Sequence, residues 1–149
     1  MKISLTLNDE ATELEIDADA MLLDVVRAHG LTGTKEGCAA GVCGACTVVV
    51  DDVPVSSCLY FAALCDGKQI LTIEGISTRD PSVIAAFVEF EGMQCGICTP
   101  GQVVAAYTLK REHPGASEAE VREYMAGNLC RCTGYVTITD AVRSYVAGD

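Results

Sequence analysis

The chain has 149 residues, half of them hydrophobic, with no tryptophan and a formal net charge of −11 at pH 7. This size and composition fit one compact domain or two small ones and exclude a disordered chain. So acidic a protein is a poor partner for nucleic acid or anionic membranes, and we expect it to bind a surface that is neutral or basic.

The first half of the chain predicts a small α+β domain over residues 1–76. Apolar and polar residues alternate over Lys2–Leu7 and again at Leu14 and Ile16, a pattern that predicts a β-hairpin. A helical period follows over residues 19–28, with Gly30 as its stop. Further strands are predicted at residues 47–50 and 69–73.

The second half predicts a helical domain over residues 77–149. A polar stretch at Ser77–Pro81 marks the predicted boundary, after which the apolar period changes from two to about 3.6. Predicted helices cover residues 83–90, a segment that begins at Thr99–Pro100, residues 117–126 with a Ser-x-x-Glu capping box, and residues 138–146. Four short helices predict a small bundle.

The N-terminus lacks the unbroken apolar stretch of a signal peptide, and no segment approaches the roughly 20 apolar residues that span a bilayer. We therefore expect no membrane span and a cytoplasmic, reducing location. Cysteines in such a compartment more often bind metal than form disulfides.

Eight of the nine cysteines fall into two quartets. The first reads Cys38-x4-Cys43-x2-Cys46 and is completed by Cys58 beyond an intervening hairpin. This spacing is typical of plant-type ferredoxins, in which four thiolates hold one [2Fe–2S] cluster. Zinc sites more often use paired C-x2-C knuckles, so the pattern favours iron–sulfur over zinc or buried free thiols.

The second quartet consists of Cys95-x2-Cys98, just before a predicted helix, and Cys130-x-Cys132 in the loop between the last two helices. A bundle can bring these loops together at one end. The spacing alone fits a cluster, a zinc site or a redox-active disulfide. The ninth cysteine, Cys65, belongs to neither quartet, and we expect it to be a buried, inert thiol.

The residues around both quartets resemble the iron–sulfur subunit of the molybdenum hydroxylases, a family that includes xanthine dehydrogenase, aldehyde oxidoreductase, aerobic carbon monoxide dehydrogenase and 4-hydroxybenzoyl-CoA reductase. The matching stretches are residues 33–48, 94–101 and 127–135. The resemblance implies a plant-ferredoxin-like β-grasp domain followed by a four-helix-bundle [2Fe–2S] domain. It also implies that Gln94 and Cys132 contact the molybdopterin of a separate large subunit, and that a medium subunit carries FAD.

No Ser/His/Asp set, Walker loop or Rossmann fingerprint is present, so we expect no catalytic residue or substrate site on this chain. The sequence predicts the electron-transfer subunit of a molybdenum hydroxylase complex, with two [2Fe–2S] clusters that relay electrons between the molybdopterin site and a flavin subunit or an external acceptor. The alternatives are a free-standing ferredoxin-like carrier and a zinc-stapled interaction module. The second metal domain argues against the first, and the plant-type spacing argues against the second.

Overall fold

The structure is a computed structural model that describes residues 1–148. Within these residues the strands are β1 (Lys2–Leu7), β2 (Glu10–Glu15), β3 (Thr47–Val50), β4 (Val53–Ser56) and β5 (Gln69–Leu71). The α-helices are α1 (Leu22–Ala28), α2 (Ile73–Arg79), α3 (Pro81–Glu89), α4 (Thr99–Glu112), α5 (Glu118–Met125) and α6 (Val136–Ala147). None of these helices is long and apolar enough to cross a membrane. The predicted α+β class is confirmed.

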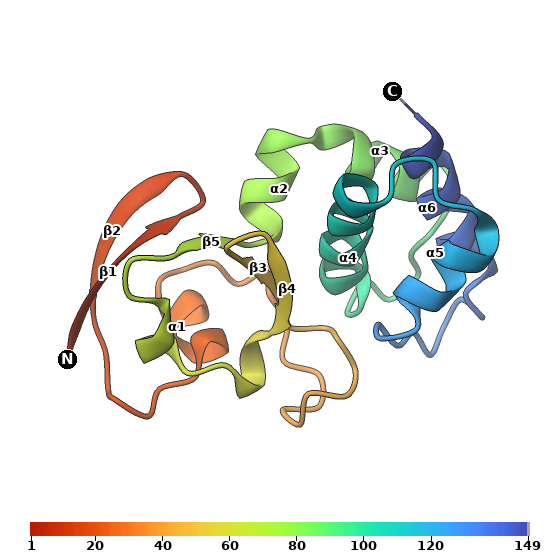
Figure 1. The fold of residues 1–149 in the computed structure, drawn as a ribbon. Coiled ribbons are helices and arrows are strands. Elements are labelled where there is room, and N and C mark those ends of the chain that lie inside the picture. The colour runs from red at the N-terminus through yellow and green to blue at the C-terminus, as the bar shows by residue number, and fades with distance from the viewer. Residues whose placement is uncertain (149) are drawn as a thin grey trace.

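The strands form one mixed sheet in the order β2-β1-β5-β3-β4. β1 pairs antiparallel with β2, from Lys2 opposite Glu15 to Leu7 opposite Glu10, which confirms the predicted hairpin. β1 also pairs parallel with β5, and β5 pairs antiparallel with β3. In Figure 1 the sheet and α1 lie on one side of the molecule, α3 to α6 lie on the other, and α2 lies between them.

β2 is largely exposed and β1 is buried on one face, but β3 is buried on both faces of the sheet. Its residues Val48 and Val50 belong to the core between the sheet and α1, whereas Val49 belongs to the core of the helices. Side chains on a strand point alternately to opposite faces, so one short strand contributes to both cores. Because α4 packs on β3, the helices and the sheet share apolar contacts.

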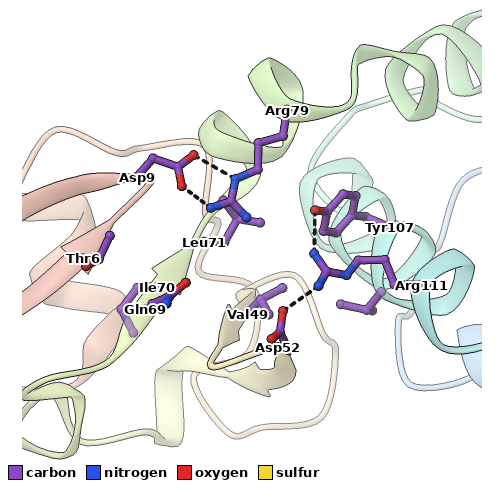
Figure 2. Close-up of a pocket in the computed structure, with 11 residues that line it drawn as sticks. Thr6, Asp9, Val49, Asp52, Gln69, Ile70, Leu71, Arg79, Tyr107 and Arg111 are labelled. Carbon is purple, nitrogen blue, oxygen red and sulfur yellow. Dashed lines mark hydrogen bonds and ion pairs between the residues drawn. The ribbon is translucent and has the colours of Figure 1, made fainter.

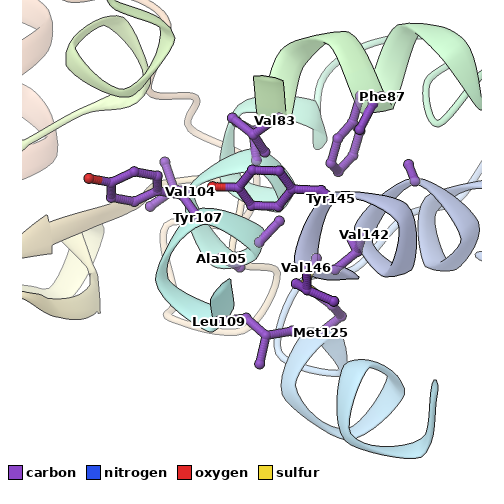
Figure 3. Close-up of a cluster of buried hydrophobic side chains, with 14 of the residues drawn as sticks. Val83, Phe87, Val104, Ala105, Tyr107, Leu109, Met125, Val142, Tyr145 and Val146 are labelled. Atoms are coloured by element: carbon purple, nitrogen blue, oxygen red, sulfur yellow. The ribbon is translucent and has the colours of Figure 1, made fainter. Parts of the chain in front are cut away.

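α4 is the central helix of the second half. Its residues Gly101–Leu109 are all buried, which explains why no single apolar stripe marks this segment in the sequence. Figure 3 shows side chains from α3, α4, α5 and α6 converging on one cluster around it, including Phe87, Leu109 and Val142. The predicted capping box is present at the start of α5, where Ser117 and Glu120 bond reciprocally.

Two arginine–aspartate pairs also join the helices to the turns of the sheet (Figure 2). Arg79 at the end of α2 binds Asp9 in the β1–β2 turn, and Arg111 of α4 binds Asp52 in the β3–β4 turn at 2.8 Å. Arg111 also donates to the hydroxyl of Tyr107, 3.0 Å away. Exposed ion pairs contribute little to stability, so the apolar contacts are the main attachment between sheet and helices.

The predicted polar boundary differs from the structure in one respect. The strand predicted at residues 69–73 ends at Leu71, and residues 73–79 form α2, so the polar stretch is helical as far as Arg79. The helix forms because Ile76 is fully buried and because Glu74 Oε1 accepts a hydrogen bond from Gly33 N at 2.8 Å. The division into domains 1–76 and 77–149 stays a prediction, and its last residue, 149, lies outside the described residues.

Candidate functional site

The first cysteine loop wraps its backbone around the sulfur of Cys38. The N–H groups of Ala40, Val42 and Cys43 each donate to this sulfur at 3.4 Å. A left-handed backbone at Gly41, with φ of 70°, allows the loop to curl this tightly. The N–H of Cys43, followed by those of the other two residues, lowers the pKa of Cys38 to about 6. The loop therefore favours a thiolate at this position.

The other two cysteines of the first quartet are buried. Cys46 directly precedes β3, and Cys58 lies in a 3-10 helix, Ser57–Leu59, that follows β4. The hydroxyl of Ser57 donates to the carbonyl oxygen of Cys46 at 2.6 Å and joins the two segments. Cys46 and Cys58 pack with Leu23 of α1. Burial, and after it the neighbouring Cys46, raises the pKa of Cys58.

The second quartet comes from two loops at one end of the helices. Cys95 and Cys98 precede α4, and Cys130 and Cys132 lie between α5 and α6. The Sγ atoms of Cys95 and Cys132 are 3.4 Å apart. Cys98 contacts Cys130; burial, and after it this contact, raises the pKa of Cys98 to about 12. The structure thus brings these four sulfurs together as two pairs.

Thr133 and Tyr135 hold the loop that carries Cys130. The hydroxyl of Thr133 donates to the sulfur of Cys130 at 3.2 Å. The N–H of Cys130 donates to the hydroxyl of Tyr135 at 3.0 Å, and the N–H of Tyr135 donates to Thr133 Oγ1 at 3.1 Å. Tyr135 adopts a left-handed backbone with φ of 70°, which is costly for a residue other than glycine. Burial acts to raise the pKa of Cys130, but the hydrogen bonds from Thr133 and its neighbours outweigh it and the pKa is lowered.

Both quartets line one surface hollow of about 380 Å³. Cys38 and Cys43 contribute from the first quartet, and all four cysteines of the second contribute, together with Ile97 and Leu129. The two loops touch directly, because the N–H of Leu129 donates to the carbonyl oxygen of Cys43 at 2.9 Å. The two candidate centres are therefore neighbours.

The pairing of the sulfurs decides which kind of centre the site fits. Within residues 1–148, no group of three or more His, Cys, Asp or Glu side chains is placed to hold a single metal ion. A structural zinc site gathers four ligands around one ion, whereas a [2Fe–2S] cluster takes two thiolates on each of two irons. Pairs of cysteines fit the binuclear cluster better than the single ion.

Comparisons with known proteins agree with this reading. A family model described as "2Fe-2S iron-sulfur cluster binding domain" matches residues 5–70, and one described as "[2Fe-2S] binding domain" matches residues 72–143. The chain is 43% identical to the nicotinate dehydrogenase small FeS subunit of Eubacterium barkeri, over 95% of this chain and 92% of that protein. The chain belongs to the iron–sulfur subunit family of the molybdenum hydroxylases.

Solved structures of this family match the fold closely. Quinoline 2-oxidoreductase from Pseudomonas putida 86 superimposes with a TM-score of 0.93 at 42% identity, over 98% of this chain and 92% of that chain. Aldehyde oxidoreductase from Desulfovibrio gigas also gives 0.93, at 39% identity, but this chain covers only 17% of it. Xanthine dehydrogenase from Emericella nidulans is 45% identical over 89% of this chain, which spans 11% of that protein. The same fold therefore occurs as a small chain and as part of much larger ones.

As a member of this family the chain carries [2Fe–2S] clusters and forms part of an oxidoreductase. The donor set fits such clusters, because the thiols lie in pairs and backbone N–H groups and a hydroxyl already point at individual sulfurs. The zinc-stapled module and the free-standing carrier are not favoured.

The remaining predicted residues lie as follows. Gln94, which directly precedes Cys95, and Cys132 are both exposed. Cys65 is fully buried in the core of the sheet, and burial raises its pKa to about 11, as expected for an inert thiol. Sequence reasoning missed Thr133, whose hydroxyl donates to Cys130, and Asn128, whose Nδ2 donates to the carbonyl oxygen of Gly44. Both lie within the family-like stretch 127–135, which was the available signal.

Proposed function

We propose that this chain is the electron-transfer subunit of a molybdenum hydroxylase complex, placed between the molybdopterin site of a large partner subunit and an FAD subunit or another acceptor. Family membership supports this role. The observation that carries it is that the eight cysteines lie as sulfur pairs and that six of them, drawn from both quartets, line one hollow. The β-grasp and four-helix domains, the boundary at residues 76 and 77, and a cytoplasmic location belong to the same proposal.

The contacts suggest which thiolates share an iron. Cys38 touches Cys43, and Cys46 touches Cys58, in the first quartet. In the second quartet the pairs are those of Cys95 with Cys132 and of Cys98 with Cys130. When bound, each [2Fe–2S] cluster supplies a one-electron redox couple. We assign the ligands of the two clusters accordingly: Cys38, Cys43, Cys46 and Cys58 for the first, and Cys95, Cys98, Cys130 and Cys132 for the second.

The protein's own part is to place these sulfurs and to set their surroundings. N–H groups around Cys38 and the hydroxyl of Thr133 at Cys130 stabilise negative charge on sulfur, which raises a reduction potential. Burial of Cys46, Cys58 and Cys98 excludes water from one side of each centre.

The exposed rim of the second quartet supports a contact with the large subunit. Cys132 belongs to this quartet and Gln94 directly precedes Cys95; both are exposed, and we propose that they face the molybdopterin. The apolar side chains of Ile97, Leu129 and Tyr135 are also 50, 46 and 39% exposed there. Exposed apolar side chains grouped in this way are typical of a protein interface. The FAD subunit would then lie on the side of the first quartet.

The ligand assignment can be tested on the full chain after reconstitution with iron and sulfide. Reduction should give two distinguishable electron paramagnetic resonance (EPR) signals. Cys46→Ser should abolish one signal and Cys98→Ser the other, while Cys65→Ala, the matched control, keeps both. A single signal in the unmutated chain, or loss of a cluster in Cys65→Ala, would contradict the assignment.

A further inference from the structure

One buried side chain joins the two cysteine loops. Asn128 is 7% exposed and lies two residues before Cys130. Its Nδ2 donates to the carbonyl oxygen of Gly44 at 3.0 Å and to Thr47 Oγ1 at 3.3 Å. Gly44 directly follows Cys43, so a single carboxamide connects a residue beside the first quartet with a residue beside the second.

Gln102 holds Asn128 from the opposite side. This fully buried side chain donates from Nε2 to the backbone oxygen of Asn128 at 2.6 Å. The backbone N–H of Gln102 donates to the oxygen of Cys98 at 3.0 Å in the first turn of α4. Gln102 therefore ties the residues before Cys130 to the residue Cys98, which belongs to the other half of the second quartet.

Close backbone packing leaves little freedom around these bonds. A Cβ added at Gly44 would lie 2.6 Å from both Asn128 Nδ2 and the oxygen of Gly127. A Cβ added at Gly101 would lie 2.1 Å from the oxygen of Gly44. Nothing larger than hydrogen fits at either position, so α4 and the two loops meet backbone to backbone.

We propose that Asn128 is a positioning residue that fixes the separation and relative orientation of the two clusters, with Gln102 as its support. Buried polar networks are directional, and a fully satisfied donor specifies one arrangement where apolar packing would allow several. The Nδ2 of Asn128 meets two acceptors, the carbonyl oxygen of Gly44 in the first cysteine loop and Thr47 Oγ1 at the start of β3. This inference rests on the proposed function, because it takes the two quartets to be cluster sites.

The test uses the full chain with both clusters reduced. Two paramagnetic clusters at a fixed separation split each other's EPR lines, and the splitting falls with the cube of the distance. Asn128→Ala should change the size of this splitting or broaden the split lines, while the iron content per chain equals that of the unmutated chain. A splitting identical to that of the unmutated chain, with both clusters bound, would overturn the proposal.

Asn8→Ala is the matched control. Asn8 is also a bridging asparagine: its Nδ2 donates to Thr72 Oγ1 and its Oδ1 accepts from Thr72 N, both at 2.9 Å. It joins the β1–β2 turn to the start of α2, and its side-chain hydrogen bonds involve no residue of either cysteine loop. Its loss should lower stability and leave the splitting unchanged. A change as large as that in Asn128→Ala would show a general effect of loosening and would overturn the proposal.

Two milder variants keep the test decisive if Asn128→Ala fails to bind iron. Thr47→Val removes one acceptor of Asn128, and Gln102→Leu removes its support and fills the site with an apolar side chain of similar size. Both variants should change the splitting in the same direction as Asn128→Ala, but by a smaller amount. Unchanged splitting in both would overturn the proposal, whereas absence of two cluster signals in the unmutated chain would instead refute the proposed function.

Discussion

Gly101, in the first turn of α4, packs directly against the backbone carbonyl of Gly44 in the first cysteine loop. The oxygen of Gly44 would lie 2.1 Å from a Cβ at position 101, well inside contact distance. The helix that follows Cys98 thus rests on the loop that carries Cys43 and Cys46. The sheet and the helices meet at the candidate clusters as well as at their apolar cores.

This contact predicts that Gly101→Ala destabilises the chain. Alanine in place of a helical glycine normally gains about 0.5–1 kcal/mol, but forcing a methyl group into a filled site costs about 1–3 kcal/mol. The second effect is larger, and the obstructing atom is backbone, so the free energy of unfolding should fall. Gly127→Ala is the control, because nothing lies within 4 Å of a Cβ there. Equal denaturation midpoints for Gly101→Ala and the unmutated chain would contradict this.

Thr133→Val should make the reduction potential of the second cluster more negative. The hydroxyl of Thr133 donates to Cys130 Sγ at 3.2 Å, and valine keeps the shape without the donor. A hydrogen bond that favours the reduced state by about 1 kcal/mol corresponds to about 40 mV for one electron. A redox titration followed by EPR measures the shift, with Thr137→Val in α6 as control. An unchanged potential would show that the hydroxyl does not tune the cluster.

Cys132→Ser should damage the second cluster and spare the first. Cys132 is exposed and lies beyond Asn128 and Leu129, whose bonds to the first loop the substitution leaves intact. Iron per chain should fall by about half, since each cluster holds two irons, and the EPR signal of the first cluster should persist. Loss of both signals would mean that the first loop depends on the second cluster.

Tyr145→Phe should lower stability by about 1.5–3 kcal/mol, the usual value of a lost hydrogen bond to a charged group. The buried Tyr145 donates to Asp80 Oδ2 at 2.7 Å, at the start of α3. Burial of Asp80 acts to raise its pKa, but bonds from Ser82 and Tyr145 outweigh it and the pKa is lowered.

The sign of the pH dependence follows from that shift. Because the pKa of Asp80 is lower in the folded protein, ionised Asp80 contributes its full stabilisation above the pKa of the unfolded chain, about 3.9. This contribution is lost as the pH falls through the pKa of the folded state. Urea unfolding at neutral pH should therefore show the difference between Tyr145→Phe and the unmutated chain, and the difference should narrow in acid. Equal stability at neutral pH would contradict the prediction.

The sequence predicted the elements whose stabilising pattern is local. Alternation over Lys2–Leu7 and the capping box at Ser117 were sufficient for β1 and α5. α2 was missed because its stability comes from the burial of Ile76 and the bond between Glu74 and Gly33, which no local pattern reveals. Tertiary contacts override weak local propensity in such segments.

In the candidate site, too, local sequence patterns were predictable and tertiary contacts were not. Spacing grouped the cysteines into two quartets, because each [2Fe–2S] cluster takes four thiolates and the plant-type spacing assigns the first four to one cluster. The bond between Asn128 and Gly44 joins residues 84 positions apart, and neither residue carries a chemical signal of its own. The pairing of sulfurs between the two loops of the second quartet likewise depends on how the helices pack.

The most direct test is metal analysis of the complex isolated from its own host through a tag on this chain. The proposed function predicts about four iron atoms and about one molybdenum for each copy of the chain, since two clusters hold two irons each, together with a larger co-purifying subunit. Iron without molybdenum or a larger subunit would contradict the molybdenum hydroxylase assignment. Zinc in place of iron would contradict the electron-transfer role altogether.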